Sequence, residues 1–243
     1  MPDFSRADHL PNLREGGEPP PSDWLPRQRR GTTPQMIGRY PDYDVLDNQG
    51  HWDQATRAVV LGRLQPPAGF RFFAPAEVLG LRALCDLLLA QDREPRVPVA
   101  AMVDQTLAEG RLDGYQYQGM PADGETWRRV LAAMEGLAQE AGERGFGSAP
   151  ATLQEGLVKS FAAGRLSRDS LGGLDPKRCF SVCMRMAVSA FYSHPWAWNE
   201  IGFGGPAYPE GYMRRGPVGT REPHERSDAR AEDPVPVARE LEG

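Results

Sequence analysis

The chain has 243 residues, of which 40% are hydrophobic and 25% charged, so it is long enough to bury a substantial core. Its formal net charge is −5, which leaves no electrostatic footprint for nucleic acid or for an anionic membrane. The three cysteines, Cys85, Cys179 and Cys183, are too few for a secreted disulfide framework and fit a reducing compartment. No apolar run approaches the ~20 residues that span a bilayer, so direct membrane insertion is not expected.

Residues 1–46 predict an extended, proline-rich arm. Proline fixes φ and removes a backbone donor, so a run such as Pro19-Pro20-Pro21 favours extended chain. One interpretation is a disordered tail, as this composition often gives. The other is an arm that orders on a partner chain, with Trp24, Leu25 and Tyr40 as its anchors.

The first thirty residues also bear on location. An export signal needs a run of about 7–15 apolar residues after its basic region. Arg29-Arg30 resembles the start of a twin-arginine signal, but Gly-Thr-Thr-Pro-Gln follows it. We therefore expect a cytoplasmic protein, periplasmic only if it is exported with a partner that carries the signal.

Between residues 47 and 194, apolar residues recur at three- and four-residue spacing, which is the pattern of amphipathic helices. Glycine- and proline-containing loops separate the periodic segments, and alternation with period two does not persist. The sequence therefore predicts an all-α protein, a compact bundle of five to six helices with long irregular N- and C-terminal extensions. The helices are expected at residues 47–64, 75–91, 98–110, 125–144, 150–164 and from 176 to about 194.

The same pattern divides the chain into four segments. The last segment is rich in Arg, Asp, Glu and Pro and has few large apolar groups, so it cannot bury enough surface to offset its ordering entropy. The expected segments are an extended arm at 1–46, a helix and linker at 47–69, a helical domain at 70–213 and a disordered charged tail at 214–243.

Motifs for nucleotide or haem binding are absent from the sequence. Gly202-Phe203-Gly204-Gly205 follows a helix and leads into Pro206, so it does not open a helix on a phosphate. Cys179 and Cys183 lie four residues apart, with His194 further along the chain. Small packed residues explain that spacing more simply than a metal site does, and a mid-helix thiol lacks the usual cause of a lowered pKa. We predict no catalytic, cofactor-binding or metal-binding residue in this chain.

The most informative segment runs from Phe191 to Tyr212 and reads FYSHPWAWNEIGFGGPAYPEGY. It is expected to leave a helix and form a Gly/Pro-rich loop that carries aromatic side chains, which would supply large anchors for a partner. The alternative is a loop that closes over its own core. The candidate partner-binding residues here are Trp196, Trp198, Asn199, Phe203, Tyr208 and Tyr212.

This segment resembles the C-terminal signature of the gluconate 2-dehydrogenase subunit 3 family. In that family a helix runs into an aromatic residue, a proline-containing turn, an Asn and a glycine-rich loop. Phe72-Phe73-Ala-Pro-Ala-Glu, with the Leu-rich helix after it, is similar to the family's opening helix. The resemblance covers about residues 70–213.

The resemblance implies a non-catalytic small subunit that helps to fold, stabilise or export a larger one. The large subunit would be a flavoprotein dehydrogenase of the glucose-methanol-choline type, which holds the FAD and oxidises an alcohol carbon of a sugar or sugar acid. A separate cytochrome often accepts the electrons in such complexes. Many members carry a twin-arginine signal that is not found here, and residues 1–65 extend beyond the common short members.

Two other functions stay open at the level of sequence. One is a free-standing helical metal-dependent enzyme that uses Cys179, Cys183 and His194. The other is a stand-alone helical binding module.

Overall fold

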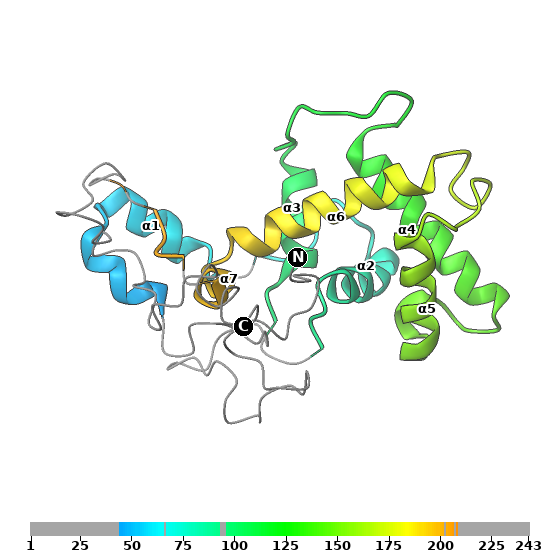
Figure 1. Ribbon diagram of the computed structural model, residues 1–243, viewed down its shortest axis with the longest axis horizontal. Coiled ribbons are helices and arrows are strands. Elements are labelled where there is room, and N and C mark those ends of the chain that lie inside the picture. The colour runs from blue at the N-terminus through cyan, green and yellow to red at the C-terminus, as the bar shows by residue number, and fades with distance from the viewer. Residues whose placement is uncertain (1–43, 66, 93–95, 202, 207, 209–243) are drawn as a thin grey trace, which may run out of the picture. The chain divides into compact units, whose positions relative to one another are not determined.

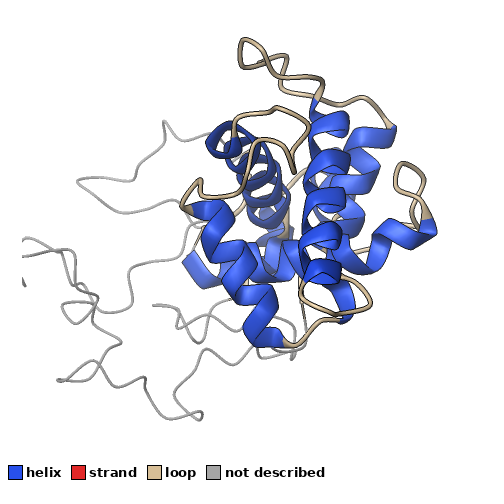
Figure 2. Cartoon of the chain, turned by 90° about the vertical axis from the view of Figure 1, so that its right-hand side faces the viewer, coloured by secondary structure: helices blue, strands red, loops and turns tan. Residues whose placement is uncertain are grey.

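The computed structural model of the chain describes residues 44–65, 67–92, 96–201, 203–206 and 208. Across these ranges the regular structure is helical and no strand occurs, so the predicted all-α class is confirmed (Figure 2). None of the helices in this part of the chain combines the length and the apolar character that a bilayer crossing needs. The elements labelled in Figure 1, together with two 3-10 helices η2 and η3, are in chain order η2 (Val45–His51), α1 (Gln54–Gly62), α2 (Pro75–Leu88), α3 (Val99–Ala108), α4 (Asp123–Glu140), η3 (Phe146–Ser148), α5 (Ala151–Ala162), α6 (Pro176–Ser193) and α7 (Pro195–Ile201).

The chain divides into two compact units, which we call unit 1 and unit 2. Unit 1 comprises residues 1–65, 93–97 and 193–243, and its described elements are η2, α1 and α7. Unit 2 comprises residues 66–92 and 98–192 and contains α2 to α5, η3 and all of α6 but its last residue. The predicted division of the chain at residues 46, 69 and 213 stays a prediction.

The helix expected at 47–64 forms as two pieces because Asp44, before this segment, caps one helix and Asp53, within it, caps a second. The Asp44 carboxylate accepts a hydrogen bond from the Leu46 N–H at 3.0 Å and starts η2. The Asp53 carboxylate accepts from the Thr56 N–H at 2.7 Å and starts α1. An N-cap aspartate satisfies a backbone N–H that the first helical turn leaves unpaired, so Asp53 begins a new helix rather than continuing the old one.

The core of unit 2 is built from the apolar faces that the spacing predicts on α2 to α6. Fully buried side chains of this kind each stabilise a fold by about 1.5–3 kcal/mol. Phe161 of α5 also meets Phe180 of α6 edge to face, with ring centres 5.3 Å apart. Side chains with no exposed surface include Leu81, Leu84 and Cys85 of α2, Val103 of α3, Trp127, Val130 and Met134 of α4, Phe161 of α5, and Cys179 and Cys183 of α6.

The turn η3 packs against both α2 and α4. Its glycine permits the close approach: a Cβ at Gly147 would lie 2.6 Å from the backbone carbon of Leu79, nearer than real Cβ atoms come. Glu135 of α4 holds the start of the same turn, because its carboxylate accepts from the Phe146 N–H at 2.9 Å.

A buried carboxylate that the sequence analysis missed fixes the entry to α2. Asp104 lies on α3 with no exposed surface. One of its oxygens accepts from the N–H groups of Phe72 and Phe73, at 3.0 and 2.8 Å, and the other accepts from the Arg71 N–H at 2.6 Å. Three hydrogen bonds from consecutive backbone donors offset the cost of burying the charge. The sequence contains one indication of this role, which is that Asp104 lies in the middle of an otherwise apolar helix face.

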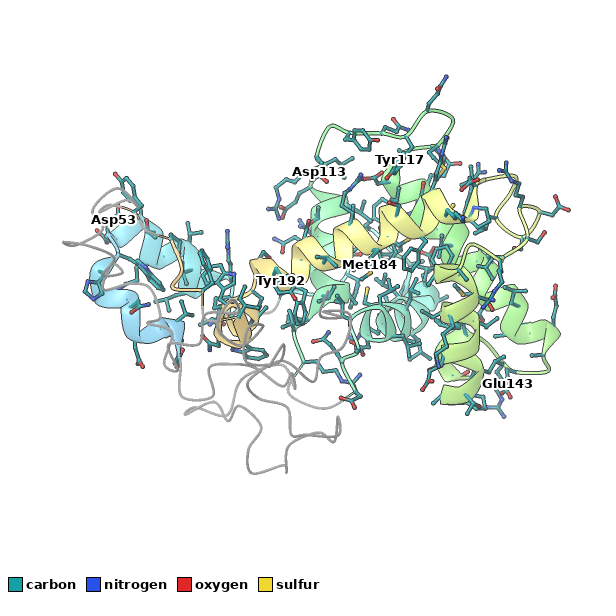
Figure 3. All side chains as sticks on the ribbon, viewed as in Figure 1. Asp53, Asp113, Tyr117, Glu143, Met184 and Tyr192 are labelled. Atoms are coloured by element: carbon teal, nitrogen blue, oxygen red, sulfur yellow. The ribbon has the colours of Figure 1, made fainter. Side chains whose placement is uncertain are left out.

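The loop between α3 and α4 is held against α6 by charged and hydroxyl groups of unit 2. Arg185 of α6 pairs with Asp113 of the loop and with Asp123 of α4, each at 3.1 Å. Burial raises the pKa of the Asp123 carboxyl, and the charge of Arg185 opposes that rise. The Tyr117 and Ser181 hydroxyl oxygens lie 2.9 Å apart. Asp113 and Tyr117 are labelled on this loop in Figure 3.

Candidate functional site

The aromatic segment after α6 belongs to unit 1, where part of it forms that unit's core. Trp198 of α7 packs with Val45, Trp52 and Val60, with Leu46 against the cluster. The Trp198 side chain is 4% exposed. Its ring therefore contributes to the fold of unit 1 directly.

Residues 195–201 form helix α7, where the sequence analysis expected a loop. Pro195 occupies the first helical position, which suits its fixed φ and its missing N–H. His194 precedes it as the N-cap: its Nδ1 accepts from the Trp196 N–H at 3.2 Å, and its carbonyl accepts from the Ala197 N–H at 3.0 Å. The sequence pattern predicts only that a helix ends near residue 194, whereas in the structure the dipeptide His194-Pro195 also starts the next helix.

The capping role of His194 depends on its neutral form. The side chain is 1% exposed, and burial lowers its pKa to about 4, with a further contribution from the positive charge of Arg63. At neutral pH the imidazole is therefore uncharged, and Nδ1 keeps the lone pair that accepts from Trp196. The ring also meets the Trp196 ring at an angle, with centroids 4.7 Å apart.

Two buried asparagines tie the end of α7 to η2. The Asn199 Oδ1 accepts from the Val45 N–H at 2.7 Å, and Asn48 donates from Nδ2 to the Gly204 carbonyl at 3.2 Å. Gly205 completes this closure with φ +84°, and a Cβ there would lie 2.7 Å from the Trp52 ring. Residues far apart in the sequence thus form one small core, and only glycine fits position 205 without displacing it.

Other side chains of the same segment face solvent. Ile201 is 47% exposed, Phe203 38% and Tyr208 62%. The Phe203 ring meets the Trp198 ring edge to face, with centroids 5.4 Å apart. Arg63, the C-cap of α1, places its guanidinium carbon 5.5 Å from the centre of the Trp198 ring and donates to the Ser193 carbonyl at 3.1 Å.

Five of the nine predicted partner-binding residues lie within the described ranges, and these five separate into three groups. Trp198 and Asn199 are buried in unit 1, Phe203 and Tyr208 are exposed, and Trp196 is intermediate. Whether any of them contacts a partner stays a prediction. The remaining four lie outside the described residues: Trp24, Leu25, Tyr40 and Tyr212.

The three thiols of unit 2 are buried and free. Burial raises the pKa of Cys179 to about 11, and it raises the pKa values of Cys85 and Cys183 well above the usual range. The thiolate is the nucleophilic and metal-binding form, and its fraction at neutral pH is therefore very small at these positions. Over the described ranges, no group of three or more His, Cys, Asp or Glu side chains is placed to hold a metal ion.

The described residues thus define an all-α protein in which the buried side chains of His194, Asp104, Asp123, Asn48 and Asn199 cap helices or hold loops. A model of the family described as Gluconate 2-dehydrogenase subunit 3 matches residues 75–205. This span is more than half of the chain and runs from α2 to the turn at Gly205, so the chain belongs to the gluconate 2-dehydrogenase subunit 3 family. Membership of a subunit family implies a complex with other subunits. No curated protein matches the chain, and no solved structure matches it.

Proposed function

We propose that this chain is the non-catalytic small subunit of an FAD-dependent dehydrogenase. In this proposal it binds and stabilises a large flavoprotein subunit of the glucose-methanol-choline type, which oxidises an alcohol carbon of a sugar or a related compound. The FAD belongs to the large subunit, and a cytochrome serves as a further electron acceptor. The observation that carries the proposal is the family match over residues 75–205.

The chemistry of the buried polar groups supports an accessory role. Asp104 uses both carboxylate oxygens on backbone N–H groups, and His194 uses Nδ1 as a helix cap. Burial keeps the Cys179 thiol protonated at neutral pH. Catalytic acids, bases and nucleophiles need a pKa near the working pH. Burial shifts the pKa values of Cys179 and His194 away from neutral pH, and the Asp104 oxygens are occupied by backbone hydrogen bonds.

The exposed aromatic side chains next to this rigid core support a role in assembly. Phe203 and Tyr208 are large and exposed, and the N–H of Phe203 donates to the Trp198 carbonyl at 3.0 Å, which holds the backbone of this anchor. Anchors held in one conformation lose little entropy on binding, which is the usual property of interface hot spots.

Co-expression with a glucose-methanol-choline-type flavoprotein of the same genome tests the proposal. The two chains should copurify as a yellow complex with FAD at one equivalent per large subunit, whereas this chain alone should be colourless. The matched control is the large subunit expressed alone, which should be less soluble or less stable. Stoichiometric FAD retained by the isolated small chain, or a large subunit that never copurifies with it, would contradict the proposal. We place the complex in the cytoplasm, or in the periplasm when the partner carries the export signal, and fractionation of cells checks this.

A further inference from the structure

Arg63 makes several contacts within unit 1. It caps α1, its guanidinium lies over the Trp198 ring, and it donates to the Ser193 carbonyl. Burial lowers the pKa of this group below its ordinary value, although an arginine stays protonated at any physiological pH. Among the described residues, no carboxylate forms an ion pair with it. Four other arginines of the described residues lie over aromatic rings: Arg128 and Arg185 have a carboxylate within 4.0 Å, whereas Arg82 and Arg178, like Arg63, form no ion pair with a described carboxylate.

An arginine that is partly desolvated and forms no ion pair with a described carboxylate has incurred part of the cost of an ion pair without its electrostatic gain. Side-chain entropy adds to this, because contacts with a tryptophan ring and a backbone carbonyl restrict the guanidinium. A carboxylate from outside the chain would find the donors already oriented, so the pair would form with little further loss.

The neighbouring apolar surface supplies a second observation. Phe203 contacts the same Trp198 ring and is 38% exposed, and Ile201 shortly before it is 47% exposed. The N–H of Phe203 donates to the Trp198 carbonyl at 3.0 Å, so the backbone of Phe203 is fixed relative to that ring. The Arg63 guanidinium and the Phe203 ring thus both contact the Trp198 ring, and both are accessible to solvent. Cationic and aromatic side chains are common in interface hot spots.

We propose that Arg63 and Phe203, held on Trp198, form a docking surface for a segment of the partner subunit that presents an acidic side chain beside an apolar one. The carboxylate pairs with the Arg63 guanidinium, and the apolar side chain packs on Phe203. This inference rests on the proposed function, since it names the chemistry by which the large subunit is recognised. The charge pair sets the orientation of docking and the salt dependence of assembly, and the aromatic contact supplies the apolar burial.

The experiment measures the affinity of single-residue variants for a co-expressed, purified flavoprotein large subunit. Arg63→Glu should weaken binding by at least about thirtyfold, because truncating one partner of a buried charge pair and reversing its sign is costly. Arg63→Lys keeps the charge but loses the planar stacking, and it should weaken binding by about three- to tenfold. Phe203→Ala should weaken it by about tenfold.

Arg57→Glu is the matched control, because it makes the same charge change on the exposed surface of the same helix. It should change the affinity by no more than about twofold, as expected for a charge outside the contact. Raising the salt concentration should weaken the wild type more than Arg63→Gln. Melting temperatures of the free variants identify any variant that unfolds. If Arg63→Glu unfolds, the proposal is tested with Phe203→Ala instead, because the Phe203 side chain is partly exposed.

The outcomes separate the two proposals. If the wild-type chain binds no flavoprotein subunit, the proposed function fails and this docking surface fails with it. If the wild type binds and the Arg63 and Phe203 variants bind equally well, the docking surface alone is wrong. Equal weakening by Arg63→Glu and Arg57→Glu would show general electrostatic attraction and would also overturn it.

Discussion

Removal of the Asp104 carboxylate should destabilise unit 2 by an amount that the hydrogen bonds predict. In Asp104→Ala, the Phe73 N–H is left buried without an acceptor, which costs about 1–3 kcal/mol. The N–H groups of Arg71 and Phe72 are partly buried, so water recovers some of their loss, at about 1 kcal/mol each. The free energy of unfolding should therefore fall by about 3–5 kcal/mol.

The variant Asp104→Asn tests the contributions of the two carboxylate oxygens separately, because it replaces one oxygen by an NH₂ group. One oxygen accepts from both Phe72 and Phe73, and an asparagine carbonyl can keep these two bonds. The other oxygen accepts from Arg71, where the amide NH₂ would instead face a donor. This variant should lose about 2 kcal/mol, less than Asp104→Ala.

Urea unfolding followed by far-ultraviolet circular dichroism measures both changes through the transition midpoint. Asp169→Asn is the control, because its side chain is exposed and should change stability by less than about 0.5 kcal/mol. If Asp104→Ala costs less than about 1 kcal/mol, the three hydrogen bonds do not hold the entry to α2 as we argue.

Three further predictions follow from unit 1 and the arm. For His194, the imidazole binds a proton near pH 6.5 in the unfolded chain but near pH 4 in the folded one, so stability should fall by about 3 kcal/mol as pH drops through this window. The variant His194→Asn keeps a capping acceptor and should abolish that part of the slope, as thermal melts at pH 7 and pH 4.5 would show; an unchanged slope would contradict the assignment. Trp198→Ala should cost about 3–5 kcal/mol because the side chain is 4% exposed, whereas Trp196→Ala, at a partly exposed position, should cost clearly less in the same melts. Equal losses would mean that the two tryptophans share one role. Deletion of residues 1–43, a cut placed before the buried Val45, should leave the helical circular dichroism signal per helical residue unchanged and weaken copurification with the large subunit. Unchanged copurification would show that the arm does not contact that partner.

The periodicity of apolar residues predicted the helices of unit 2, because the buried face of each helix is set by the spacing of residues close together in the sequence. Leu81, Leu84 and Cys85 recur on one face of α2, and all three are buried. The predicted ends of these helices were less accurate. Helix α4 begins at Asp123, two residues before the expected start at 125, and ends at Glu140, before the expected end at 144. The start of α7 was missed because the same proline can follow one helix and open the next.

The site could be predicted only in part, because its critical contacts join distant residues. The aromatic segment was identified from its composition, and the alternative that it closes its own core describes Trp198 and Asn199. The position of Arg63 carried no local signal, since its environment depends on residues more than a hundred positions away. The partners of Asp104 were likewise set by tertiary contact rather than by spacing.

The hydrogen bond between Asn199 and Val45 joins residues 154 positions apart, and this separation has a consequence for synthesis. At translation rates of about 5–20 residues per second, the ribosome needs on the order of 8–30 s to add the intervening chain. During that interval Val45 and Trp52 lack the ring of Trp198 that packs with them. Unit 2, whose residues are complete at Tyr192, can fold before then. Arg63 and Phe203 can come together on Trp198 only after residue 203 has emerged. A nascent chain released earlier would lack the proposed docking surface and would expose apolar groups that chaperones and proteases recognise.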